Sequence, residues 1–118
     1  GAAPGYVSSG METWDLSNLD VQPRQPEVLS SDEEGRVIAI QLPAGEKLDE
    51  HQVHERAWLL VISGAIEVDD SGGATTRGGP GMLAHFDPNE RHEVRAADDS
   101  LLLLLLSPWP GVGHPSQR

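Results

Sequence analysis

Four of the five histidines in this chain lie in two short segments separated by a glycine-rich stretch. His51 and His54 belong to the first segment, and His85 and His92 belong to the second. Imidazole is a common ligand of divalent metals and changes its protonation near neutral pH. A fold that brings the two segments together would therefore create one site for metal binding or proton transfer.

The segments around these histidines are predicted to be β-strands. Apolar alternation and β-branched residues, with Gly and Pro turns between them, predict strands at 36–42, 57–63, 65–69, 82–86, 92–96 and 100–106. The polar residues 49–52 favour a turn, residues 1–12 a loose tail and residues 22–26 a connector. The six leucines at 101–106 indicate a strand buried on both faces or a short buried helix, and their position after several other strands favours the strand. Short strands at near-regular spacing, without an amphipathic helix, indicate an antiparallel sandwich or barrel.

Composition limits the size of the fold and the class of partner. A chain of 118 residues with 37% hydrophobic residues is expected to form one globular domain. Its net charge of −11 disfavours nucleic acid and membrane surfaces, so we expect neither as a partner. The absence of cysteine excludes disulfides and thiolate metal sites. Residues 1–5 lack the basic start and apolar run of a secretion signal, and we expect a cytoplasmic protein.

The first histidine segment resembles the first motif of the cupin family. That motif runs Gly, five residues, His, one residue, His, three or four residues, Glu, six residues, Gly. Gly45, His51 and Gly64 fall on its first Gly, first His and final Gly. Val53 stands at the position of the second His, and Ala57 stands at the position of the Glu.

The second segment resembles the second cupin motif, which runs Gly, five residues, Pro, one residue, Gly, two residues, His, three residues, Asn. Gly81 and His92 match it in type and spacing. Asp87, Asn89 and Ala96 replace the Pro, the Gly and the Asn. The resemblance therefore keeps one histidine of each motif and changes several of the other positions.

The resemblance covers roughly residues 36–107 and implies a cupin-type jelly-roll β-barrel, also called a double-stranded β-helix. We expect residues 31–107 to form this barrel. Residues 1–30 would be an N-terminal tail and lead-in segment, and residues 108–118 a Pro- and Gly-rich C-terminal tail.

Metal-bearing cupins bind a divalent ion such as zinc, iron, manganese or nickel through three His and one Glu. Of these four ligand positions in the family motifs, only those at His51 and His92 hold the same residue type in this chain. Because a catalytic metal normally has three protein ligands, a third would have to come from His54, Glu55 or His85. We expect His54 as the third ligand, with His85 as the alternative.

Strand geometry bears on both candidates. Side chains alternate between the faces of a strand, so His54 joins His51 only if the chain turns or bulges between them. His85 faces inward if Leu83 does, and outward if Phe86 faces inward. The sequence does not decide which of these two orientations His85 has.

The resemblance leaves two functions open. The first is a metal-dependent cupin that binds or acts on a small organic molecule, with Trp58 and Phe86 lining its pocket. The alternative is a non-catalytic, metal-free cupin that binds a ligand or serves in assembly, with His51 and His92 as hydrogen-bonding groups. Under either function we expect a homodimer, because the leucine strand is apolar on both faces.

Overall fold

Strands dominate the computed structural model, which describes residues 6–8, 10–51 and 55–107, with side chains for 10–48 and 55–107. In chain order the elements are β1 (Tyr6–Ser8), β2 (Met11–Thr13), η1 (Leu16–Asn18), β3 (Glu27–Asp32), β4 (Gly35–Leu42), β5 (Lys47–His51), β6 (Arg56–Ser63), β7 (Ile66–Asp69), β8 (Thr75–Gly78), β9 (Leu83–Phe86), β10 (His92–Ala96) and β11 (Ser100–Ser107).

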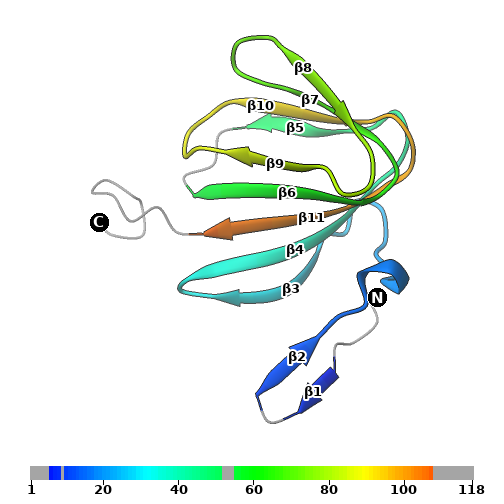
Figure 1. Cartoon of the computed structure of the whole chain (residues 1–118), viewed down its shortest axis with the longest axis vertical. Helices are drawn as coiled ribbons and strands as arrows, with labels where there is room; N and C mark the ends of the chain where they lie inside the picture. The colour runs from blue at the N-terminus through cyan, green and yellow to red at the C-terminus, as the bar shows by residue number, and fades with distance from the viewer. Residues whose placement is uncertain (1–5, 9, 52–54, 108–118) are drawn as a thin grey trace.

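Two antiparallel sheets form the body of the protein (Figure 1). The strand order is β5-β10-β7-β8 in the four-stranded sheet and β3-β4-β11-β6-β9 in the five-stranded sheet. The hairpin β1–β2 is a separate two-stranded sheet. The predicted all-β fold is confirmed. Within the described residues, no helix is long and apolar enough to cross a membrane.

The core lies between the two sheets and follows the alternation of the strands. In β6, residues 57, 59 and 61 are buried, and the residues between them are partly buried on the outer face. The strand β11 lies between β4 and β6 in the sheet, and the predicted burial on both faces is confirmed because its leucines belong to two apolar clusters. Leu102 and Leu106 join the inner core, and Leu101 and Leu103 join a second apolar cluster on the outer face.

Residues 14–21 contribute to this second cluster and so cover part of the outer face of the five-stranded sheet. Leu19 and Val21 are buried there, and Trp14 and Leu16 pack against the same cluster. The side chain of Asp15 accepts a hydrogen bond from the backbone N–H of Ser17 and so caps the short 3-10 helix η1.

Four predictions from the sequence need correction. Residues 6–8 and 11–13 form a hairpin rather than a loose tail, and residues 47–51 form β5 where a turn was expected. The strands β3 and β8 were not predicted, and β3 begins at residue 27, inside the expected lead-in segment. The strands β3, β5 and β8 are all edge strands. An edge strand has a neighbour on one side only and is more exposed, so its sequence shows a weaker apolar pattern than that of a central strand.

Candidate functional site

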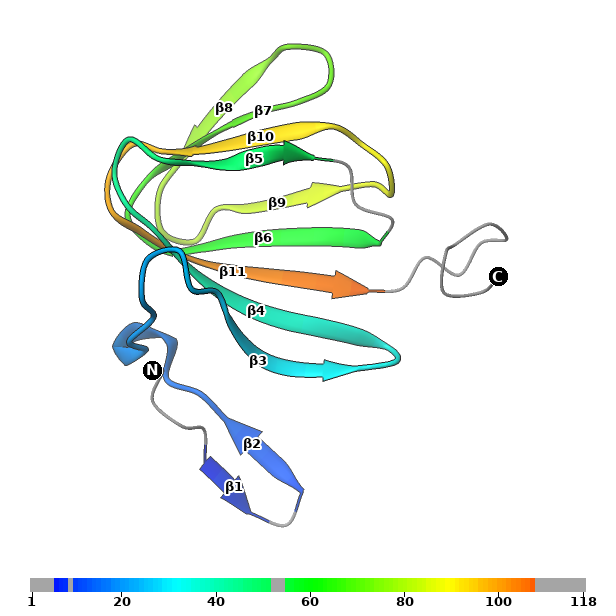
Figure 2. The same ribbon diagram turned by 180° about the vertical axis from the view of Figure 1, so that it is seen from behind.

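The two histidine segments meet at one end of the sandwich, which we call the mouth. There β5 and β9 end, and β6 and β10 begin (Figure 2). The ladder between β5 and β10 pairs His92 with His51. The register of this ladder shifts between His92 and Val94, which pairs with Leu48. Without the shift, residue 50 would lie opposite His92, so the irregularity places the two histidine positions as direct partners.

The imidazole of His92 is held in one orientation by two neighbours. It is 8% exposed and stacks on the ring of Phe86, with ring centroids 3.8 Å apart and planes 10° apart. Its Nδ1 lies 3.2 Å from the backbone carbonyl oxygen of Glu90. A carbonyl only accepts hydrogen bonds, so Nδ1 carries a proton, and in the neutral imidazole Nε2 is the nitrogen without one. This tautomer suits a metal ligand that binds through Nε2.

The turn before His92 has the features of a type II β-turn. Pro88 is its second residue, Asn89 has φ of 66° at the third, and the N–H of Glu90 donates to the carbonyl oxygen of Asp87. The side chain of Glu90 accepts a hydrogen bond from the backbone N–H of Asp87 at 3.0 Å. The sequence reading missed this role of Glu90, although the Pro-Asn pair signals a turn.

Three of the matched motif residues are glycines at positions where the backbone conformation favours glycine. Gly45, Gly64 and Gly81 have φ of 84°, 93° and 92°, in the left-handed region that favours glycine. Asn89, which replaces a motif glycine, also has positive φ, and Asn tolerates this region better than most residues. A Cβ atom at Gly64 would lie 2.3 Å from Oγ of Ser100.

The interior next to His92 is apolar and nearly full. A cavity of about 20 Å³ is lined by Leu48, Ala57, Leu59, Phe86, His92, Val94, Leu104 and Leu106. This volume is close to that of one water molecule. A ligand larger than one water molecule therefore does not fit in this cavity.

Ala57 lines this cavity at the position where the cupin motif has its Glu. The donor set of this chain therefore does not fit a site of three His and one Glu. Of the two histidines that match the motifs, His92 is the one whose side chain the structure describes, and its Nδ1 lies 3.2 Å from the carbonyl oxygen of Glu90. Within the described side chains, which exclude those of residues 51 and 54, no three His, Asp or Glu residues are grouped to hold a metal.

His85 lies on the opposite face of β9 from Phe86. Phe86 is buried in the core, whereas the His85 side chain is 37% exposed and lies 3.0 Å from Nη1 of Arg56. The guanidinium only donates, so Nε2 of His85 accepts this hydrogen bond. Arg56 also contacts a carboxylate oxygen of Asp87 at 3.1 Å. His54 lies outside the described residues.

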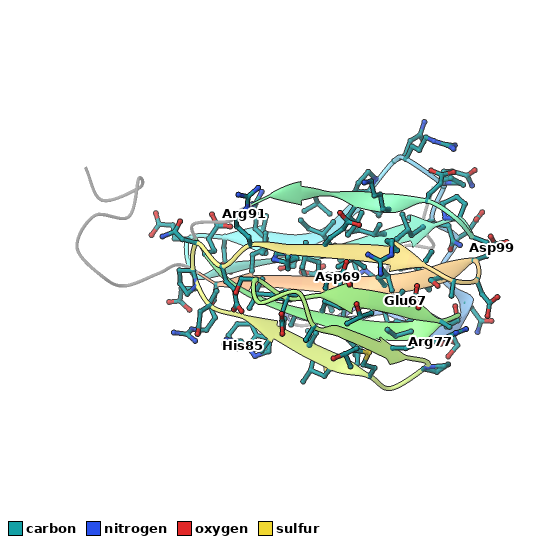
Figure 3. The ribbon with its side chains drawn as sticks, turned by 90° about the horizontal axis from the view of Figure 1, so that it is seen from above. Glu67, Asp69, Arg77, His85, Arg91 and Asp99 are labelled. Atoms are coloured by element: carbon teal, nitrogen blue, oxygen red, sulfur yellow. The ribbon has the colours of Figure 1, made fainter. Side chains whose placement is uncertain are left out.

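Trp58 also lies on the outer face of the five-stranded sheet. It is paired with His85 across the ladder, and the two rings have centroids 5.2 Å apart. Phe86 therefore lines the interior cavity, and Trp58 instead borders a surface hollow beside Leu105. Figure 3 shows His85 and Arg91 at the same end of the sandwich but on opposite sides of it, with Asp99 at the other end.

The outer face of the four-stranded sheet carries a charged network. Arg95 donates to the carboxylate of Asp69 at 2.5 Å and to that of Glu93 at 3.0 Å. Thr75 also donates to Asp69 at 2.6 Å. Hydrogen bonds from Arg95 and then from Thr75 lower the pKa of Asp69 to about 2. This face is therefore charged, whereas the outer face of the other sheet carries the apolar cluster that includes Leu101 and Leu103.

The comparison with known families agrees with this architecture. The sequence model of the Cupin domain family matches residues 38–107, which is more than half of the chain. A search of curated proteins found no match.

Several solved structures share the fold. KdgF from Halomonas sp. is 26% identical with a TM-score of 0.66, over 76% of this chain and 85% of that chain. A cupin superfamily protein from Desulfitobacterium hafniense is 11% identical with a TM-score of 0.74, over 92% and 100% of the two chains. An RmlC-like cupin with a double-stranded β-helix fold from Methanocaldococcus jannaschii is 18% identical with a TM-score of 0.70, over 83% and 87%.

Proposed function

Because the chain belongs to the cupin family, we propose that it holds a divalent metal at the mouth and there binds a small organic molecule. His51, His92 and His54 would be the protein ligands. The observation that carries the proposal is the register of the ladder, which pairs the positions of His51 and His92. Histidines at paired positions of neighbouring strands are close enough to serve one ion.

The surroundings of His92 support its role as a ligand. The Glu90 carbonyl oxygen fixes the proton on Nδ1, and the Phe86 ring holds the imidazole plane. Fixing the tautomer and the ring orientation in advance lowers the cost of ordering the ligand when the metal binds.

The placement of His85 favours His54 as the third ligand. The His85 side chain lies on the outer face and accepts a hydrogen bond from Arg56, so its use would require that bond to break and the strand to turn. His54 follows β5 by a few residues and belongs to the segment that joins β5 to β6.

A site made of neutral imidazoles would leave the full double positive charge of the ion in place. When bound, such an ion acts as a Lewis acid toward oxygen ligands. The chain would supply orientation through His92 and an apolar wall through Phe86 and Leu106. A carboxylate or carbonyl oxygen of a small molecule is the ligand class that this charge favours.

One observation favours the metal-free alternative, in which the mouth binds a ligand by hydrogen bonds or serves in assembly. Ala57 removes the carboxylate of the family motif, and His92 is the only polar residue that lines the cavity in the described part of the chain. A site with two imidazoles alone would hold a metal weakly.

Metal analysis of protein purified without a nickel column separates the two functions. We expect about one equivalent of metal per chain, lost in His51→Ala and in His92→Ala. His85→Ala is the matched control, because that imidazole lies on the outer face, and it should keep the metal. A folded wild-type protein that takes up no zinc, manganese, iron or nickel would support the alternative.

A further inference from the structure

A hollow of about 230 Å³ opens between strands that belong to the two different sheets. Ile40 and Leu42 of β4 line it from the five-stranded sheet, and Leu48 of β5 lines it from the four-stranded sheet. The first two belong to the inner core, and Leu48 packs against that core. The strand β4 ends and β5 begins at the end of the sandwich opposite the mouth (Figure 2), so we call this hollow the far hollow.

The rim of the far hollow includes Arg24, which occupies a turn position that does not favour arginine. The N–H of Gln25 donates to the carbonyl oxygen of Gln22 at 3.2 Å, with Pro23 as the second residue and Arg24, at φ of 63°, as the third. These are the features of a type II β-turn, in which glycine or asparagine is favoured at the third position. The backbone therefore does not explain an arginine here, and we look to its side chain.

Two cations line the rim, and both are held only by exposed ion pairs. The guanidinium of Arg24 pairs through Nη2 with the carboxylate of Glu46, and such a group carries five N–H donors. The Nζ of Lys47 lies 3.7 Å from a carboxylate oxygen of Glu93. The side chains of Arg24 and Lys47 are 71% and 57% exposed. Ion pairs this exposed contribute little free energy, so either cation can turn toward another anion at low cost.

The sign of the lining charges separates the far hollow from two other hollows on the described surface. Here Arg24 and Lys47 outnumber Glu46. Acidic side chains outnumber basic ones in the other two, which are lined by Asp69, Asp70, Glu93 and Arg91 and by Asp32, Glu34 and Arg36. In a chain of net charge −11, an anion is repelled least where basic side chains exceed acidic ones.

We propose that the far hollow binds a small monocarboxylate with an apolar body. The carboxylate lies at the rim with Arg24 and Lys47, and the apolar body covers Ile40, Leu42 and Leu48. A volume of about 230 Å³ equals that of roughly eight water molecules, so the ligand has about eight non-hydrogen atoms. The proposal is independent of metal binding at the mouth.

A titration of the full chain with hexanoate, followed by NMR, tests the site. We expect saturable shifts of the Leu42 and Leu48 methyl signals with a Kd of about 1 mM. Hexylamine has the same chain length and the opposite charge, and it should bind at least about tenfold more weakly. The absence of saturation up to about 20 mM hexanoate, or equal binding of hexylamine, would overturn the proposal.

Three variants test the role of Arg24. Arg24→Gly removes the guanidinium and suits the turn, so we expect a Kd for hexanoate at least about fivefold higher with no loss of melting temperature. Arg36→Gln is the control for net charge and should leave the Kd unchanged. Glu46→Gln keeps Arg24 and removes a repelling carboxylate, so it should bind at least as tightly as the wild type. A loss in either control equal to that in Arg24→Gly rejects Arg24 as a ligand-binding residue.

The same titration in EDTA separates the far hollow from the mouth. Leu48 lines both the far hollow and the cavity beside His92, whereas Leu42 lines the far hollow and not that cavity. We expect EDTA to leave the Kd and the Leu42 shifts unchanged. Binding that EDTA abolishes, with shifts at His92 and none at Leu42, would place hexanoate on a metal at the mouth and reject the far hollow as its site.

Discussion

Phe86 and His92 lie ring against ring, with centroids 3.8 Å apart and planes 10° apart. Their strands, β9 and β10, belong to different sheets, so this stack joins the two sheets at the mouth. Both residues are more than nine-tenths buried. The stack therefore contributes to the core and also holds the candidate ligand in place.

Shortening Phe86 should reduce stability and loosen His92 together. We expect Phe86→Ala to lower the free energy of unfolding by about 3–5 kcal/mol because it leaves a cavity in a packed core. Phe86→Leu, which removes less of the side chain, should cost less than Phe86→Ala. Urea unfolding measures both values, and imidazole NMR signals of His92 report its ordering. A His92 signal unchanged in both variants would contradict an orienting role for the ring.

Restoring the motif carboxylate at Ala57 should destabilise the metal-free protein. Ala57 is 2% exposed beside a cavity of about 20 Å³, which is too small for a longer side chain. We expect Ala57→Glu to cost roughly 2–5 kcal/mol from crowding and from burial of a polar group. Added manganese or zinc should recover part of this loss, because the carboxylate gains a cation.

Ala57→Gln is the control for that experiment, since it has the same length and no charge. We expect metal to raise the melting temperature of the Glu variant more than that of the Gln variant. An equal response in both variants would place the metal away from residue 57.

Gly64 and Gly45 should respond differently to the same substitution. At Gly64 a Cβ would lie 2.3 Å from Oγ of Ser100 and 2.4 Å from the carbonyl oxygen of Asp99. At Gly45 nothing lies within 4 Å, and only the positive φ opposes alanine. Gly45→Ala should therefore cost about 1–2 kcal/mol, and Gly64→Ala should cost about 4 kcal/mol or more. Denaturant midpoints check the order, and equal costs would contradict the close approach.

Acid should remove the stability that Asp69 provides. Hydrogen bonds from Arg95 and Thr75 hold its folded pKa at about 2, below the ordinary value of 3.8. Between these two values the unfolded chain binds more protons than the folded protein, so the free energy of unfolding falls as pH falls through this window. Asp69→Asn should flatten this part of the pH profile. Glu33→Gln in the β3–β4 turn controls for the change in net charge, and an Asp69→Asn profile as steep as that of the wild type would be evidence against the Arg95 network.

The inner strands could be predicted from the sequence because their burial leaves a local signature. Residues 57, 59 and 61 alternate with outer residues in β6, and the six leucines mark a strand with an apolar layer on each side. The edge strand β5 could not be predicted this way. Its polar residues 49–51 become a strand because β10 supplies the hydrogen bonds.

The same distinction between local and long-range information applies to the candidate site. The sequence by itself determined the all-β class, the central strands, the turn glycines and the histidines as candidate ligands, because alternation and backbone conformation are local properties. Only the tertiary structure decided that position 51 lies opposite His92, that His85 faces outward and that β1–β2 stands apart. These features depend on which strands pair and in which register, and register is set by contacts between residues distant in the chain.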